Sequence, residues 1–163
     1  MDKKWLRHTL STHHEDAYRW AVQCCYQDDE LGKEVLQDVY VKVLEGKAVF
    51  REKSSFKTWL FSIIRFTAID AIKRLGKQTW VGLDAISTHV AEEGQQLVSF
   101  DKALSKLSEK QREVLILVFY HDETIESAAA VMDCSIGTAR THYHRGKEKL
   151  KELLSDYYER SGA

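Results

Sequence analysis

The stretch from Thr124 to Leu150 constrains the fold more than any other part of the chain. It runs T-I-E-S-A-A-A-V-M-D-C-S-I-G-T-A-R-T-H-Y-H-R-G-K-E-K-L, with small alanines first and charged side chains later. Thr124 can cap a first helix and Ser135 a second, because a hydroxyl can accept a hydrogen bond from an amide that a helix leaves unpaired. Between them Asp133 tolerates the left-handed conformation of a tight turn. This order predicts a helix-turn-helix, whose second helix enters the major groove of DNA.

The second helix of this motif would expose a reading surface from Thr138 to Arg145. Arginine can donate two hydrogen bonds to guanine, and each good pair discriminates by about 1–3 kcal/mol against the wrong base. Arg140 and Arg145 are therefore the first candidates for base contacts. The neighbouring His142 and His144 would add only a weak pH dependence, since the site is exposed.

The length and composition indicate a globular protein of one domain or two small ones. The chain has 163 residues, of which 44% are hydrophobic and 30% charged. No apolar run reaches the length that a bilayer requires, and the N-terminal Met1–Trp5 is too polar for a signal peptide. We therefore expect a cytoplasmic protein that does not insert into a membrane.

The cysteines and histidines do not form a recognisable chemical site. Three cysteines, of which Cys24 and Cys25 are adjacent, predict no disulfide framework, and buried reduced thiols are the expected state of all three. The seven histidines lack metal-ligand spacing and are expected at the surface. Paired catalytic carboxylates, a nucleophile–base pair and a phosphate-binding glycine loop are also missing from the sequence pattern. We expect no enzymatic activity, no cofactor and no small-molecule substrate.

The charge is segregated along the chain, although the net charge is only −1. Residues 51–80 hold seven Lys or Arg against two Asp or Glu, and residues 136–151 hold five against one. Residues 28–45 hold six acids against two bases, and residues 81–101 hold four acids and no base. Two separated basic patches indicate two contacts with nucleic acid.

Hydrophobic periodicity predicts an all-α fold of two small domains joined by a flexible acidic linker. Residues 5–26 fit one or two helices, and helical patterns follow at residues 34–45 and 56–75. The pattern is lost in the polar residues 76–99. A second domain begins at Phe100, has a capping box at Ser108–Gln111, and ends in a long helix expected to fray from Tyr157. The predicted boundaries are 1–78, 79–99 and 100–163.

One face of the helix predicted at residues 34–45 carries a mostly acidic stripe with Val41 in its middle. Residues 34, 38, 41 and 45 share this face, opposite the apolar pairs that would be buried. Such a stripe is commonly a solvated helix face. The alternative is a docking surface for a basic partner.

The helix predicted at residues 56–75 places an aromatic side chain among bases. Its expected core stripe is Phe56, Leu60, Ile63, Thr67 and Ala71. Beside that stripe lies Phe66, followed by acidic and basic side chains at helical spacing. Unpaired nucleic-acid bases stack on aromatic rings and lysines attract phosphates, so this face could bind a single strand. The alternative is that Phe66 borders the core and the lysines serve solubility.

Four stretches in this order resemble the extracytoplasmic-function (ECF) sigma factors, small two-domain subunits that give bacterial RNA polymerase its promoter specificity. The stretches are Gln37–Tyr40, Phe50–Arg51 with Ser55–Leu60, Ala68–Asp70 with Lys73–Arg74, and Leu107–Leu115 followed by the helix-turn-helix. Family members often have asparagine after the arginine at 65, where this chain has Phe66. The resemblance implies a sigma factor that binds core polymerase through its β′ and β subunits and directs initiation at promoter DNA.

The resemblance assigns candidate residues to three contacts. Those implied for core polymerase are Glu34, Gln37, Asp38, Val41 and Lys42. Those implied for the opened strand of the minus-ten element are Arg51, Lys57, Arg65, Phe66, Asp70, Lys73, Arg74 and Lys77. Those implied for the minus-thirty-five duplex are Ser135, Thr138, Arg140, Thr141, His144, Arg145 and Lys147. Trp59 is assigned to packing.

The resemblance also implies an anti-sigma partner, which can hold the protein at the membrane. Three other functions are compatible with parts of the sequence. A stand-alone helix-turn-helix regulator would bind duplex DNA without polymerase, but would not need the basic patch at residues 51–77. A polymerase-binding decoy would not depend on Arg140 and Arg145. A metal-dependent enzyme built on the histidines and cysteines is the most remote.

Overall fold

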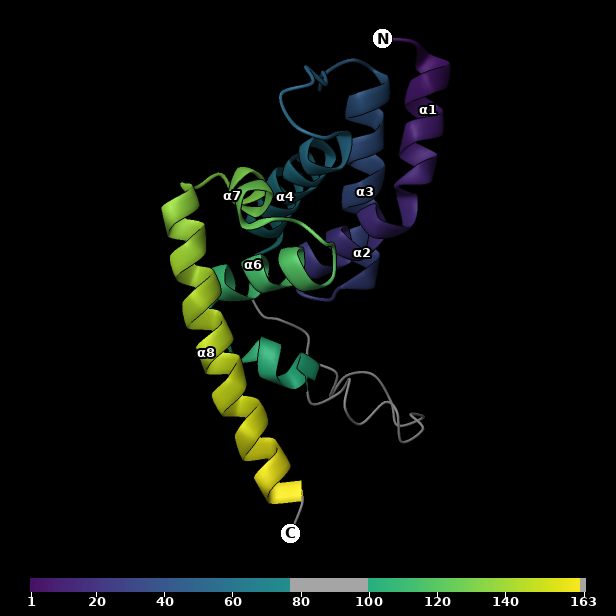
Figure 1. Cartoon of the computed structure of the whole chain (residues 1–163). Helices are drawn as coiled ribbons and strands as arrows, with labels where there is room; N and C mark the ends of the chain where they lie inside the picture. Colours follow the sequence, from purple (N-terminus) through teal and green to yellow (C-terminus); the bar gives the residue numbers. More distant parts are fainter. Residues whose placement is uncertain (77–99, 162–163) are drawn as a thin grey trace. The chain divides into compact units, whose positions relative to one another are not determined.

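The computed structural model describes residues 1–76 and 100–161, and every regular element among them is a helix (Figure 1). Within these ranges there are seven helices and, in addition, a short helical segment at residues 100–105. The chain divides into two compact units, one built from α1 to α4 and the other containing α6 and α8. The all-α prediction is confirmed. The predicted acidic linker, its boundaries and Lys77 lie outside the described residues.

The N-terminal region forms two helices, of the one or two that the sequence allowed. Helix α1 spans Lys3–Thr12 and α2 spans His14–Cys24, with His13 at the break. Asp2 caps α1, since its Oδ1 accepts a hydrogen bond from the Lys4 amide at 3.0 Å. In α2 the fully buried Trp20 donates from Nε1 to the carbonyl of Phe61 at 3.0 Å, and the two rings stack with centroids 5.6 Å apart. This pair joins α2 to α4.

Helix α3 spans Asp29–Leu44 and packs closely on α2 at Gly32. A β-carbon at Gly32 would lie 2.9 Å from Cα of Val22, which is too short for a real contact. Asp28 caps the helix, since its Oδ1 accepts from the Leu31 amide at 3.1 Å. The helix ends at Leu44, and Gly46 just beyond its cap has a φ of +77°, which is accessible to glycine at little cost.

Helix α4 spans Phe56–Leu75, the range that the sequence predicts. Ser55 caps it by accepting from the Thr58 amide at 3.1 Å, and Gly76 ends it with φ +70°. The predicted core stripe is wrong at Ile63, which is only half-buried. Phe61 and Ile64 are fully buried instead, because α4 contacts both α2 and α3 and therefore buries a wider arc than a single stripe.

In the second unit, α6 spans Glu109–Phe119 and packs along α8, which spans Ile136–Ser161. Ser108 caps α6, as the capping-box pattern predicts. The two helices approach closely at Gly146, where a β-carbon would lie 3.1 Å from side-chain atoms of Gln111 and Leu115. The expected fraying from residue 157 is wrong, since α8 remains helical to residue 161.

The helix-turn-helix is formed as the sequence predicts. Helix α7 spans Ile125–Met132, and Thr124 caps it by accepting from the Ser127 amide at 3.0 Å. Asp133 adopts the left-handed conformation with φ +54°. Ser135 caps α8 by accepting from the Thr138 amide at 3.1 Å. Local hydrogen bonds therefore define both ends of the turn.

The expectations for cysteine and histidine need correction. Cys24 and Cys134 are only half-buried, and Cys25 alone is buried, where burial and then the charge of Asp28 raise the pKa of its thiol to about 12. His121 is buried rather than at the surface. Among residues 1–76 and 100–161, no group of three or more His, Cys, Asp or Glu could hold a metal ion. No helix within these ranges is long and apolar enough to cross a membrane.

Candidate nucleic-acid and partner interfaces

The stripe on α3 lies at the surface. Glu34, Gln37, Asp38 and Glu45 are exposed, and Val41 in their midst is 51% exposed although it is aliphatic. The opposite face of the helix is buried in the first unit through Val35, Leu36, Val39 and Val43. An exposed valine between acids provides a mixed apolar and negative contact surface.

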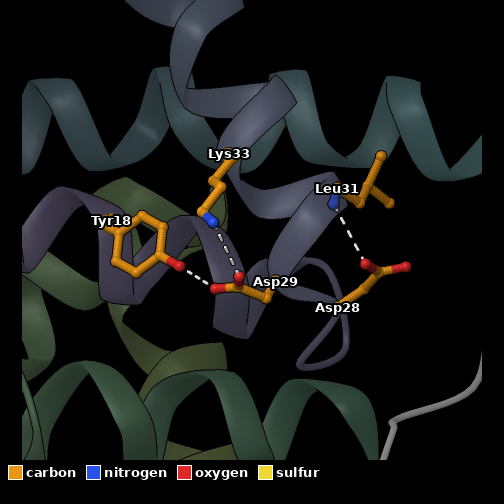
Figure 2. Close-up of polar contacts among 5 residues, drawn as sticks. All are labelled: Tyr18, Asp28, Asp29, Leu31 and Lys33. Carbon is orange, nitrogen blue, oxygen red and sulfur yellow. Dashed lines mark hydrogen bonds and ion pairs between the residues drawn. The ribbon is translucent and has the colours of Figure 1, made fainter.

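The acids of α3 fall into two groups with different roles. At the start of the helix, Asp29 accepts from the Tyr18 hydroxyl and pairs with Lys33 at 3.2 Å, and Asp28 is engaged as the cap (Figure 2). Within the described part of the chain, Glu34 and Asp38 have neither an ion pair nor a side-chain hydrogen bond. The first group stabilises the helix start, and the second remains available to a partner.

Lys42 differs from the other residues assigned to this surface. Its side chain is half-buried, and its Nζ donates to Oγ1 of Thr67 on α4 at 3.3 Å. The ammonium group therefore points toward α4 and away from the stripe. Sequence spacing could not reveal this, because it fixes the position of Cβ and not the end of a long side chain.

The candidate strand-binding face of α4 is exposed around Phe66. The ring is 50% exposed, and the charged side chains of Asp70, Lys73 and Arg74 are exposed with it. Arg51, in the loop before α4, is exposed as well. This arrangement places an aromatic ring among basic side chains on a rigid helix.

Two other basic residues assigned to this face are less accessible. Arg65 is only 5% exposed, because it lies on the side of α4 that packs into the first unit. Lys57 is half-buried, and its Nζ lies 5.5 Å from the centroid of the Phe61 ring, a cation–π arrangement. Neither could be distinguished from the exposed bases by charge pattern alone.

An aromatic cluster supports the loop that leads into α4. Trp59 lies with its ring centroid 5.3 Å from Phe50 and 5.3 Å from Phe56, and Trp5 of α1 meets Phe56 at 5.7 Å. Trp59 is thus engaged in packing, as the resemblance implied. The contribution of α1 to this cluster was not predicted, since no local pattern links residues so far apart in sequence.

The predicted reading residues of α8 are all exposed: Ser135, Thr138, Arg140, Thr141, His144, Arg145 and Lys147. The hydroxyls are engaged locally, with Ser135 bonded to Thr138 and Thr141 donating to the Gly137 carbonyl. The guanidinium of Arg140 lies 3.9 Å from Glu126, a distance typical of a weak surface pair. Within the described residues Arg145 has no ion pair, so its guanidinium is available as a donor.

Sequence reasoning missed a cleft beside this reading surface. It has a volume of about 540 Å³ and is lined in part by His144 and Arg145 together with Lys106, Gln111 and Lys149. Lys106 lies before α6, whereas the others lie on α6 and α8. The pairing of α6 with α8 brings these residues together, and no local sequence signal shows that pairing.

Comparison with known proteins identifies both units. Residues 9–78 match the family model of sigma-70 region 2, and residues 97–150 match that of sigma-70 region 4. The ECF sigma factor EcfG of Rhodopseudomonas palustris is 31% identical over 74% of this chain and 70% of its own length. The ECF sigma factor SigX of Bacillus subtilis is 29% identical over 88% of this chain and 80% of its own length.

A solved structure agrees in fold. The sigma factor RpoE of Bartonella quintana, in complex with the anti-sigma factor NepR, superimposes with a TM-score of 0.76 at 27% identity, over 93% of this chain and 98% of that chain. The two family models and the relatives are all of sigma factors, and the solved structure has the same fold. The chain therefore belongs to the ECF sigma factors, non-enzymatic subunits that direct RNA polymerase to promoters.

Proposed function

We propose that this sigma factor contacts its promoter at two places and its polymerase at a third. The helix-turn-helix binds the minus-thirty-five element as duplex, and the exposed face of α4 binds the minus-ten element as an opened strand. The stripe on α3 binds the coiled coil of the polymerase β′ subunit. The observation that carries the proposal is the half-exposed ring of Phe66 among exposed basic side chains.

The geometry of α3 supports a helical partner. Residues 34, 38, 41 and 45 are spaced by three and four, the spacing with which one helix lies along another. Glu34 and Asp38 would meet basic side chains, while Val41 would be covered by the partner's apolar atoms. Complementary charge of this kind favours fast and specific association.

The face of α4 suits an opened strand better than a duplex. A phenylalanine ring has no hydrogen-bonding group with which to read a base edge, but it stacks on any unpaired base, while Lys73 and Arg74 attract the backbone phosphates. Arg65, being buried, contributes to packing in this scheme rather than to DNA contact. Asp70 would repel phosphate, but its carboxylate can accept a hydrogen bond from a base amino group.

The reading surface of α8 suits a duplex. Arg145 and Arg140 are long enough to reach guanine in the major groove, and the exposed Lys147 can contact the backbone. Arg145 also lines the cleft with Lys106 and Lys149, which could contact phosphates, although Glu148 and Glu152 give the same cleft a mixed charge.

An anti-sigma factor is the regulatory partner that we propose. The similar RpoE structure contains such an inhibitor. The protein would act in the cytoplasm, where polymerase and chromosome are found. A membrane-bound anti-sigma factor could hold it at the membrane until a signal arrives.

Two variants of the holoenzyme test whether α8 binds the duplex and α4 the opened strand, on a promoter that the holoenzyme transcribes. Arg145→Ala should weaken binding to a closed minus-thirty-five duplex by about 1–3 kcal/mol, and should relax the preference at one base pair. Lys73→Ala should leave that duplex affinity unchanged. It should weaken binding of the opened strand and should make that binding less dependent on salt concentration. A loss of duplex affinity from both variants to the same degree would refute this assignment.

A further inference from the structure

Lys42 connects α3, the loop that follows it and α4. It lies on α3 next to Val41 of the docking stripe, yet its side chain is half-buried against α4. Its Nζ donates to Oγ1 of Thr67 at 3.3 Å, and Thr67 is only 4% exposed. A hydrogen bond from a charged donor to a buried acceptor is stronger than one at the open surface.

The main chain of Lys42 fixes the start of the loop that leads to α4. Its carbonyl accepts from the amides of Lys47 at 2.9 Å and Ala48 at 3.2 Å. The amide of Gly46 donates to the Val43 carbonyl at 3.2 Å, and Gly46 has φ +77°. These bonds form a Schellman motif, which sets the direction in which the chain leaves a helix.

Thr67 lies directly behind the proposed strand-binding face. It follows Phe66 in sequence and precedes Asp70 by one helical turn. A shift of α4 at Thr67 would therefore move the ring and the acidic side chain beside it. The bond from Lys42 opposes such a shift, because its other end is fixed on α3.

We propose that Lys42 is a positioning residue that holds the strand-binding face of α4 in place relative to the polymerase-docking helix. Once core polymerase is bound to α3, α4 would hold Phe66 at a fixed distance and angle to the opened strand. Lys42 itself would not contact the polymerase. This inference rests on the proposed strand-binding role of α4.

The test compares four holoenzymes with wild type: Lys42→Met, Lys42→Arg, Thr67→Val and the double variant Lys42→Met/Thr67→Val. Methionine keeps most of the apolar stem and removes the ammonium, whereas arginine keeps a donor. Affinity for core polymerase is measured by fluorescence anisotropy. Promoter opening at saturating core is measured by permanganate reactivity of unpaired thymines, and circular dichroism verifies folding.

We expect Lys42→Met and Thr67→Val each to lower the equilibrium constant for opening about three- to tenfold, the range for one hydrogen bond. The double variant should be no worse than either single one, Lys42→Arg should restore most of the opening, and core affinity should stay within about twofold of wild type. A tenfold loss of core affinity from Lys42→Met, with normal opening at saturating core, would overturn the inference. Additive losses in the double variant would overturn it too, as would unchanged opening in both single variants.

The strand-binding role of α4 is controlled separately in the same assay. If Phe66→Ala and Lys73→Ala impair opening while Lys42→Met does not, the positioning role fails and the proposed function stands. If none of the three impairs opening, the strand-binding role fails and the positioning role falls with it.

Discussion

The proposed strand-binding role of α4 depends most on one residue, Phe66. Helical periodicity placed it beside the core, where it could either border the packing or bind a base. The structure leaves half of the ring exposed, and α4 buries Phe61 and Ile64 instead. The ring can thus be removed without opening a cavity in the core.

Phe66→Ala should weaken retention of the opened minus-ten strand by about 1–3 kcal/mol, or roughly 5- to 150-fold, because one stacked base loses its ring. Phe66→Trp should keep the affinity. The matched control is Phe119→Ala in the second unit, where the ring is also 50% exposed. Anisotropy with a fluorescent single strand and holoenzyme measures the effect. Equal losses from Phe66→Ala and Phe119→Ala would contradict a stacking role.

Long side chains mark the limit of sequence reasoning at this scale. The sequence correctly placed Glu34, Gln37, Asp38 and Val41 on one exposed face, since helical spacing determines where each Cβ points. It grouped Arg65 and Lys42 with accessible residues, but one is buried and the other turns toward Thr67. The direction of a long charged side chain depends on the neighbouring helix, which no local pattern specifies.

At the scale of single elements, the helix starts were the most predictable feature. Ser108, Thr124 and Ser135 each cap a helix through their hydroxyl oxygens, as expected from sequence. Capping is a local interaction between residues two or three apart, so the sequence contains all the information. The close approaches at Gly32 and Gly146 are tertiary, and the sequence pattern did not indicate them.

The glycines provide a prediction for helix packing. Gly32→Ala should lower the free energy of unfolding by about 1–3 kcal/mol, because the new β-carbon would lie 2.7 Å from Cγ2 and 2.9 Å from Cα of Val22. Gly137→Ala is the matched control on α8, where the nearest atom is Ser135 Oγ at 4.0 Å, and it should stabilise by up to about 1 kcal/mol. Urea unfolding followed by circular dichroism measures both. Equal effects of the same sign would refute the packing argument.

The docking stripe provides a second prediction at this scale. Asp38→Lys should lower the affinity for core polymerase at least about tenfold, since a charge on a basic partner would then meet a like charge, which costs several kcal/mol. Glu15→Lys reverses another exposed acid, on α2, and should change the affinity by less than about twofold. Competition binding with labelled wild-type protein separates the two. A similar loss from both variants would show a general effect of charge rather than a docking site.

At the scale of the whole molecule, the order of motifs predicted more than any single one. The helix-turn-helix alone was compatible with a repressor, whereas the α3 and α4 motifs before it indicated a sigma factor. The family models for regions 2 and 4 match the same two parts of the chain. What the sequence could not supply was the pairing of helices, which forms the aromatic cluster around Trp59 and the cleft beside Arg145.

The central claim is tested most directly by in vitro transcription with purified core polymerase from the same organism. Genomic fragments are transcribed with core alone, with core plus this protein, and with core plus the Phe66→Ala/Arg145→Ala variant. We predict discrete start sites that appear only when the wild-type protein is added and are largely lost with the variant. Start sites that are the same with and without the protein, or equally strong with the variant, would contradict the account.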